Sequence, residues 1–147
     1  MKTLSEAIEE TTTRNVDTLK KIEELTEYDV GVTSQQVNTF YKLNPPLLIH
    51  KIVQELSQKI EDELIERPFF TGERMYQVNV TINALCGTGV IDLETRDALA
   101  ELSYNQTKFF YDQIVSKVCD KFLKKGFYTL RKYEAYFVVS AEPIKEK

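Results

Sequence analysis

Few residues in this chain carry side chains that do chemistry, and those few are widely separated. The sequence has one histidine, His50, and two cysteines, Cys86 and Cys119. Nucleophilic catalysis needs a nucleophile, a base and an orienting group, and a zinc site needs about four Cys or His ligands at fixed spacing. The inventory meets neither requirement. We therefore predict a protein that is not an enzyme and that binds no metal and no cofactor.

The best candidate nucleophile is Cys86, which precedes Gly87. Reactive thiols favour helix N-termini, whereas the pattern places Cys86 near the C-terminal end of a helix, so we interpret it as a structural thiol. The segment 87–89 lacks the lysine of a phosphate-binding loop and is interpreted as a turn. The acidic clusters at 61–66 and 94–101 are typical of the solvated face of amphipathic helices rather than of a magnesium site.

Charge is unevenly distributed along the chain. The net charge is −4, and residues 1–29 carry eight acids against four bases. Such an acidic pole can serve a partner or self-association. The residues predicted to bind a partner on this acidic face are Glu6, Glu9, Glu10, Glu23, Glu24 and Glu27.

The segment 108–132 has the opposite balance, with seven bases and two acids. Bases interleaved with aromatic residues can hold single-stranded nucleic acid, and they can equally hold an acidic protein surface. The simpler alternative is a set of solvated lysines over a buried aromatic core. The predicted residues of this basic pole are Lys117, Lys121, Lys124, Lys125, Arg131 and Lys132.

The segment 31–43 resembles the turn and second helix of a helix-turn-helix. Gly31 would make the turn, and Val32, Val37 and Phe40 would pack inward. The residues predicted to face DNA are Ser34, Gln35, Gln36, Asn38 and Lys42, whose side chains can read base edges or bind phosphates. The acidic residues at 23–29 would repel phosphate, so a helix-turn-helix corner without DNA is the competing interpretation.

Helical periodicity dominates the elements that must position these residues. Capping-box spacing predicts helix starts near residues 4 and 34, and steps of three and four predict an amphipathic helix over 47–65 that Asn44 caps and Pro68 ends. A wide apolar arc predicts a single helix over 93–125, the longest in the chain, with Gly126 just past its end.

Two segments have other patterns. Residues 76–82 fit both a strand and a helix, and we favour the helix because 87–89 can end it and Asp92 can cap the next one. Residues 127–140 are rich in Tyr, Phe, Val and Thr, which predicts one or two strands, with a hairpin turning near Lys132.

These elements predict a mainly α fold, a helical bundle of about five helices with a short C-terminal β-hairpin or strand. The 147 residues fit a single helical domain over 1–140, followed by a polar C-terminal tail over 141–147. The first ten residues contain no apolar run, and no stretch is long and apolar enough to span a membrane. We therefore expect a cytoplasmic protein that does not contact a membrane.

The predicted function is a non-catalytic protein–protein interaction protein, a small acidic helical inhibitor, adaptor or regulator. Its partner would be another protein of unknown identity, and the N-terminal helix also predicts a homodimer. A phage or mobile-element origin is among the expectations. The alternative is a DNA-binding transcriptional regulator that uses residues 31–43, and nucleic acid is therefore the second class of partner.

Overall fold

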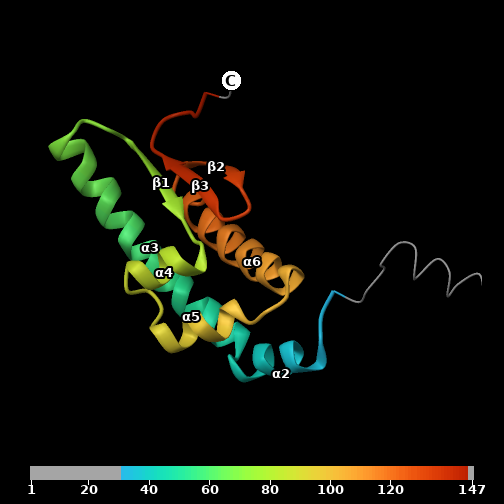
Figure 1. The fold of residues 1–147 in the computed structure, drawn as a ribbon. Helices are drawn as coiled ribbons and strands as arrows, with labels where there is room; N and C mark the ends of the chain where they lie inside the picture. The colour runs from blue at the N-terminus through green and yellow to red at the C-terminus, as the bar shows by residue number, and fades with distance from the viewer. Residues whose placement is uncertain (1–30, 146–147) are drawn as a thin grey trace, which may run out of the picture. The chain divides into compact units, whose positions relative to one another are not determined.

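The computed structural model of the chain describes residues 31–145 (Figure 1). From Val32 onward these residues form one compact unit. This unit is mainly helical with C-terminal strands, as the sequence predicts. In chain order the elements are α2 (Ser34–Lys42), α3 (Pro45–Phe70), β1 (Met75–Asn79), α4 (Ile82–Gly87), α5 (Leu93–Ala100), α6 (Tyr104–Leu123), β2 (Tyr128–Tyr133) and β3 (Tyr136–Ser140).

The three strands form one antiparallel sheet in the order β1-β3-β2. The predicted hairpin at 127–140 is confirmed as β2 and β3, with a turn at residues 134–135, just past Lys132. β3 is the central strand and pairs with both neighbours. Its residues Phe137, Val138 and Val139 are all buried, and Phe137 and Val139 belong to the hydrophobic core.

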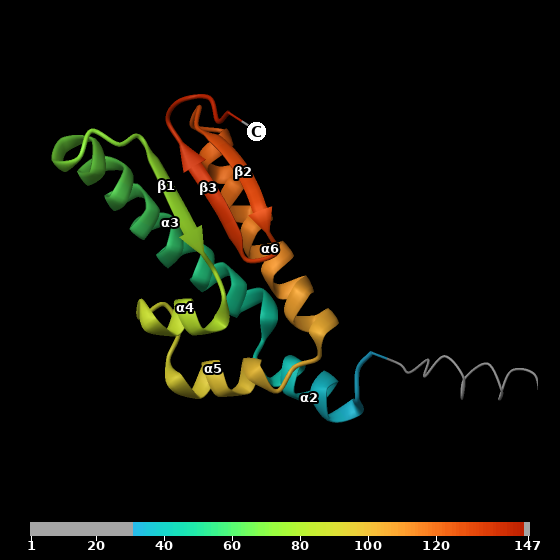
Figure 2. The ribbon, with the colours of Figure 1, turned by 45° about the horizontal axis from the view of Figure 1, so that its top comes forward.

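The sheet packs against α3 and α6, which lie next to each other (Figures 1 and 2). The core lies between these two layers, and the predicted helical bundle is not confirmed for residues 31–145. Helix residues of the core repeat at steps of three and four, as in any helix with one apolar face. The central core residues are Ile52, Leu56, Ile60, Val78, Phe110, Ile114, Val118, Phe137 and Val139.

The favoured helix at 76–82 was wrong, because most of this segment is strand β1. β1 pairs with β3, and in this pairing Val78 lies opposite Phe137 and Tyr76 lies opposite Val139. The Val80 N–H donates to the Ala135 carbonyl at 2.8 Å and extends the pairing. The helical period applies only from Ile82, where α4 begins. Two periods therefore follow each other here, and pairing with a strand far along the sequence overrides the local preference.

The single helix expected over 93–125 is two helices, α5 and α6. The helix is interrupted at residues 101–103, and Ser103 caps the start of α6. The Gln106 N–H donates to the Ser103 hydroxyl, and the Gln106 side chain accepts from the Ser103 N–H at 3.0 Å. This reciprocal pair makes a new helix start more stable than continuation of the old one. The longest described helix is therefore α3, with 26 residues.

The ends of α3 also differ from expectation. Asn44 precedes the helix with a left-handed backbone (φ +51°), and its side chain makes no capping hydrogen bond. Pro68 does not end the helix, which continues to Phe70. A proline near the last turn removes one backbone hydrogen bond, and a helix end tolerates this loss better than a helix centre. The two residues after it, Phe69 and Phe70, are exposed and stack edge to face.

Other local signals are confirmed. Thr33 and Gln36 form a capping box at the start of α2. Asp92 caps α5, since its carboxylate accepts from the Thr95 N–H at 2.7 Å. Hydrogen bonding by the Thr95 side chain, and then by the Thr95 N–H, lowers the pKa of Asp92. Gly126 follows α6 with φ +89°, a conformation that residues with a Cβ rarely adopt.

The predicted helix that starts near residue 4, its acidic face and its dimer seam lie outside the described residues. Among the helices of residues 31–145, none combines the length and the apolar character that crossing a membrane requires.

Candidate functional site

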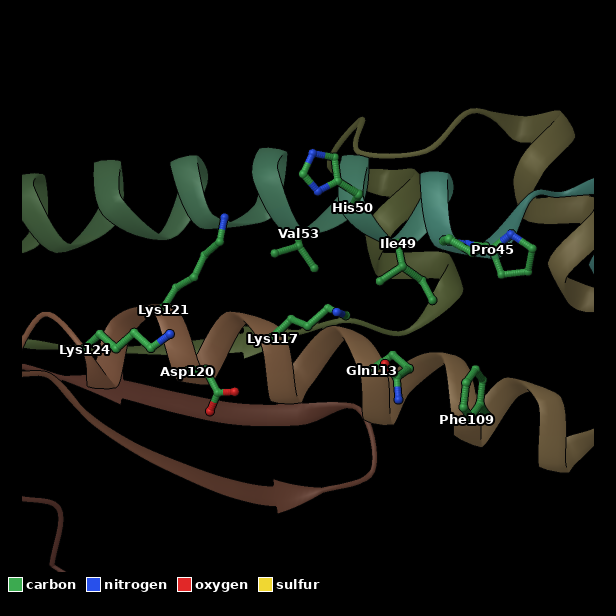
Figure 3. A pocket seen from close by; sticks show the side chains of 11 residues that line it. Pro45, Ile49, His50, Val53, Phe109, Gln113, Lys117, Asp120, Lys121 and Lys124 are labelled. Carbon is green, nitrogen blue, oxygen red and sulfur yellow. The ribbon is translucent and has the colours of Figure 1, made fainter.

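A groove runs between α3 and α6 (Figure 3). It consists of two hollows of about 550 Å³ and about 780 Å³, and Lys121 and Lys124 line both. All the lining residues come from α3, from α6 and from the turn after α6. The strands contribute none of them, so the sheet leaves this side of the helix pair uncovered.

The wall that α3 contributes is mostly apolar. Ile49 and Val53 project from α3 toward α6 in Figure 3, and they are four residues apart, which places them on one face of the helix. Farther along, Leu64 and Ile65 line the second hollow together with Phe127. Ile65 is 64% exposed. When a partner covers an aliphatic side chain this exposed, the burial of its apolar surface favours binding.

The wall that α6 contributes is mostly polar and basic. Its lining residues recur every three or four positions, so they form one stripe along the helix. Lys121 extends from α6 toward α3 in Figure 3. Phe109, at the end near α2, is 49% exposed and stacks edge to face on Phe40. The residues of this stripe are Phe109, Gln113, Lys117, Asp120, Lys121 and Lys124.

The groove is locally positive although the chain is negative. Four lysines line it, with Glu61 and Asp120 as its carboxylates, so its net charge is +2 against −4 for the whole chain. Within residues 31–145, the ion pairs involve Arg67, Arg74, Arg96 and Arg131, and none involves these lysines. None of these lysines therefore forms an ion pair with a described residue.

The predicted basic pole divides into two places. Lys117, Lys121, Lys124 and Lys125 lie together along the groove, whereas Arg131 and Lys132 line a different, smaller hollow near the hairpin turn. Arg131 pairs with Asp112 at 2.6 Å, so its charge is compensated.

The predicted DNA-facing residues lie on α2. Ser34, Gln35, Asn38 and Lys42 are exposed. Gln36 is engaged within the fold instead: its amide donates to the Glu101 carbonyl at 3.1 Å, and its backbone carbonyl accepts from Gln106. Contact with DNA stays a prediction.

One buried position expected in the helix-turn-helix segment was wrong. Val37 is 50% exposed, because the face of α2 that packs against α6 is the one that carries Phe40. Val32 and Phe40 are half-buried.

The chemically reactive side chains do not gather. His50 is exposed at the groove, whereas Cys86 and Cys119 are free and half-buried on α4 and α6. Burial raises the pKa of the Cys119 thiol. Among residues 31–145, no three His, Cys, Asp or Glu side chains lie close enough together to hold a metal ion.

Two half-buried tyrosines connect the strand and α4 to the helices. Burial raises the pKa of Tyr76, whose ring lies 4.8 Å from the Arg67 guanidinium. Burial also raises the pKa of Tyr111, whose hydroxyl accepts from the Ile82 N–H at 3.2 Å. Arg67 itself pairs with Glu63 and Glu73. These contacts belong to the structure of the unit rather than to the groove.

Sequence reasoning predicted the lysines of the groove but missed its apolar residues. Phe109 was interpreted as part of a wide buried arc, and Ile65 as the end of an amphipathic helix. One signal was present: Phe109, Gln113, Lys117 and Lys121 each precede a core residue of α6, a pattern that places a second stripe beside the buried one. Which stripe is covered depends on where the sheet packs, and the sequence period does not contain that information.

Comparison with known proteins adds no relative. No protein-family model matches the chain, and neither a curated protein nor a solved structure shows significant similarity to it. What the protein does must therefore be inferred from its own residues.

Proposed function

We propose that this chain is a non-catalytic interaction protein, an inhibitor, adaptor or regulator, and that it binds another protein in the groove between α3 and α6. One observation carries the proposal: the groove combines exposed apolar side chains with lysines that form no ion pair with a described residue. A cytoplasmic location accords with this proposal.

The apolar side chains supply the affinity in this proposal. Ile65 and Phe109 are about half or more exposed, and Phe127 lies at the far end of the same groove. Exposed apolar side chains that line one groove are typical of surfaces where a partner binds. Burying them would contribute about 25 cal/mol per Å² of apolar surface removed from water.

The chain offers a matched pair of residues for a test. Ile65 in the groove and Leu93 on α5 are aliphatic helix residues that are 64% and 61% exposed, and Leu93 is outside the groove lining. Three proteins would each be used to capture partners from a lysate of the organism that encodes the chain: the full chain, its Ile65→Asp variant and its Leu93→Asp variant. Quantitative mass spectrometry would compare the captured proteins, and circular dichroism would check that each variant is folded.

We expect at least one protein to be captured by the full chain and by Leu93→Asp but lost with Ile65→Asp. The same protein, once purified, should bind the full chain directly in calorimetry. Equal capture by all three folded chains would overturn the groove as the binding site.

The DNA-binding alternative makes a different prediction, which a titration with duplex DNA across a salt series would test. Binding to duplex at low salt that weakens steeply as salt increases, and that Gln35→Ala with Lys42→Ala abolishes, would favour the regulator that uses α2. Negligible affinity at low salt would leave the protein-binding proposal.

A further inference from the structure

We infer that the occupant of the groove is an acidic amphipathic helix of a partner protein, with its apolar stripe against α3 and its carboxylates against the lysines of α6. This inference rests on the proposed function and adds the chemistry and the orientation of the bound segment.

The length and walls of the groove suit a helix. From Pro46 to Ile65 the α3 wall covers 20 residues, or about 30 Å at the rise of an α-helix. A partner helix of about five turns would match that length. Two adjacent helices present rows of side chains with a furrow between them, and a third helix packs into such a furrow through residues spaced three and four apart.

Charge determines which amphipathic helix fits. Lys117, Lys121 and Lys124 follow one another at steps of four and three, so they line one edge of the groove at intervals of about one turn. Carboxylates at the same steps on a helix lying alongside would meet them. α6 favours lysines near its C-terminal end for its own stability, but that effect is confined to about the last turn and does not account for Lys117.

The two walls differ, and the difference fixes how the bound helix is rotated. The α3 wall is apolar apart from His50, Ser57 and Glu61, and it carries no lysine in the groove lining. A carboxylate placed against Glu61 would be repelled. The acids of the bound helix should therefore lie on the edge toward α6 only.

A phosphate backbone fits the same groove less well. The α3 wall is mostly apolar, with Ile49 and Val53 almost fully buried, and phosphates gain nothing from such a surface. Glu61 on the α3 wall would also repel a polyanion that covers both walls. A bound segment with both acidic and apolar side chains can contact the lysines of the α6 wall and the apolar residues of the α3 wall at the same time.

The test uses three fluorescein-labelled synthetic peptides of about 20 residues, each with leucines at helical spacing. The acidic peptide carries glutamates along one edge of the leucine stripe, and the two others carry lysines or glutamines at the same positions. Binding to the full chain is measured by fluorescence anisotropy at about 0.05 M and about 0.5 M salt. A single-stranded oligonucleotide of similar length is the fourth probe.

The variant is the double charge reversal Lys117→Glu with Lys121→Glu. Its control is Lys108→Glu with Lys132→Glu, which changes the net charge equally but alters the hollow near the hairpin turn instead. We expect the groove variant to weaken the acidic peptide about tenfold, from two lost pairs and two new repulsions, and the control to stay within about twofold. The groove variant should also gain affinity for the lysine peptide, a reversal that mere loss of structure would not produce.

Three results with the peptides would overturn the inference: no binding of the acidic peptide at low salt, equal affinity for the acidic and lysine peptides, or equal effects of the groove variant and its control. Preferential binding of the oligonucleotide that the groove variant abolishes would also overturn it. If any of these occurs while Ile65→Asp still loses a captured protein, the groove binds a partner of different chemistry and the proposed function stands.

Discussion

Helix α6 carries two neighbouring stripes of side chains, one that is buried in the core and one that lines the groove, and the two differ in character. Phe110, Ile114 and Val118 are buried in the core, and each follows directly after a residue that lines the groove. Phe122 is also buried, but it lines the second hollow of the groove as well. The buried stripe packs toward the sheet, and the groove stripe is open. One residue of offset thus separates the side that holds the unit together from the side proposed to bind a partner.

This difference teaches that the groove is not a poorly packed part of the core. Ile49 and Val53 in its α3 wall are themselves core residues, whereas the lysines of its α6 wall are exposed. Substitutions on the two stripes should therefore separate stability from binding.

The largest effect should come from Ile114→Ala. Ile114 is fully buried, and truncation of such a side chain costs about 3 kcal/mol through lost burial and the cavity left behind. Its groove neighbour Gln113→Ala should change the free energy of unfolding by no more than about 0.5 kcal/mol. Urea unfolding followed by circular dichroism would compare them, and similar costs would remove the distinction between the two stripes.

A smaller effect should come from Tyr111→Phe, at the margin of the buried stripe. The substitution keeps the ring but removes the acceptor of the Ile82 N–H at the start of α4. A half-buried donor left without its partner costs about 1 kcal/mol. Amide exchange at Ile82 should accelerate more than exchange within α6. Unchanged exchange there would mean that water replaces the hydroxyl without cost.

Alkaline pH should act on the same margin. Burial raises the pKa of Tyr76 and of Tyr111 in the folded chain, so the folded state holds the neutral phenols more strongly than the unfolded state does. Their contribution is complete below the unfolded pKa of about 10 and is lost as the pH rises through the folded values. The urea concentration at the unfolding midpoint should fall above about pH 10. The midpoint of the Tyr111→Phe variant should fall less steeply with pH than the midpoint of the parent chain. Parallel curves would contradict this.

The smallest effect on stability should come from the groove lysines. Lys121→Glu places an acid on an exposed rim, and the free energy of unfolding should change by no more than about 0.5 kcal/mol. Thermal unfolding in parallel with the peptide titrations would test this. A large loss of stability would show that Lys121 supports the fold.

Local signals predicted much of the fold. Thr33 with Gln36, Asp92 and Gly126 mark helix ends through contacts within a few residues, so the sequence contains them in full. Ser103 with Gln106 was an equally local signal, and it was missed because the apolar arc continued across it.

The remaining errors depend on distant residues. Whether residues 76–80 are strand or helix depends on Phe137 and Val139, about 60 positions away. The groove was predicted only as charge, because its apolar wall belongs to α3 and becomes a site only when α6 lies beside it.

The position of β3 has a consequence for how the chain folds as it is synthesised. β1 and β2 pair only with β3, which is the last strand to leave the ribosome. Until residue 140 emerges, the sheet-facing sides of α3 and α6 have no cover, and β1 waits for a partner about 60 residues downstream. Pairings this far apart in sequence slow folding, so the core of the unit is completed only once β3 is available to pair.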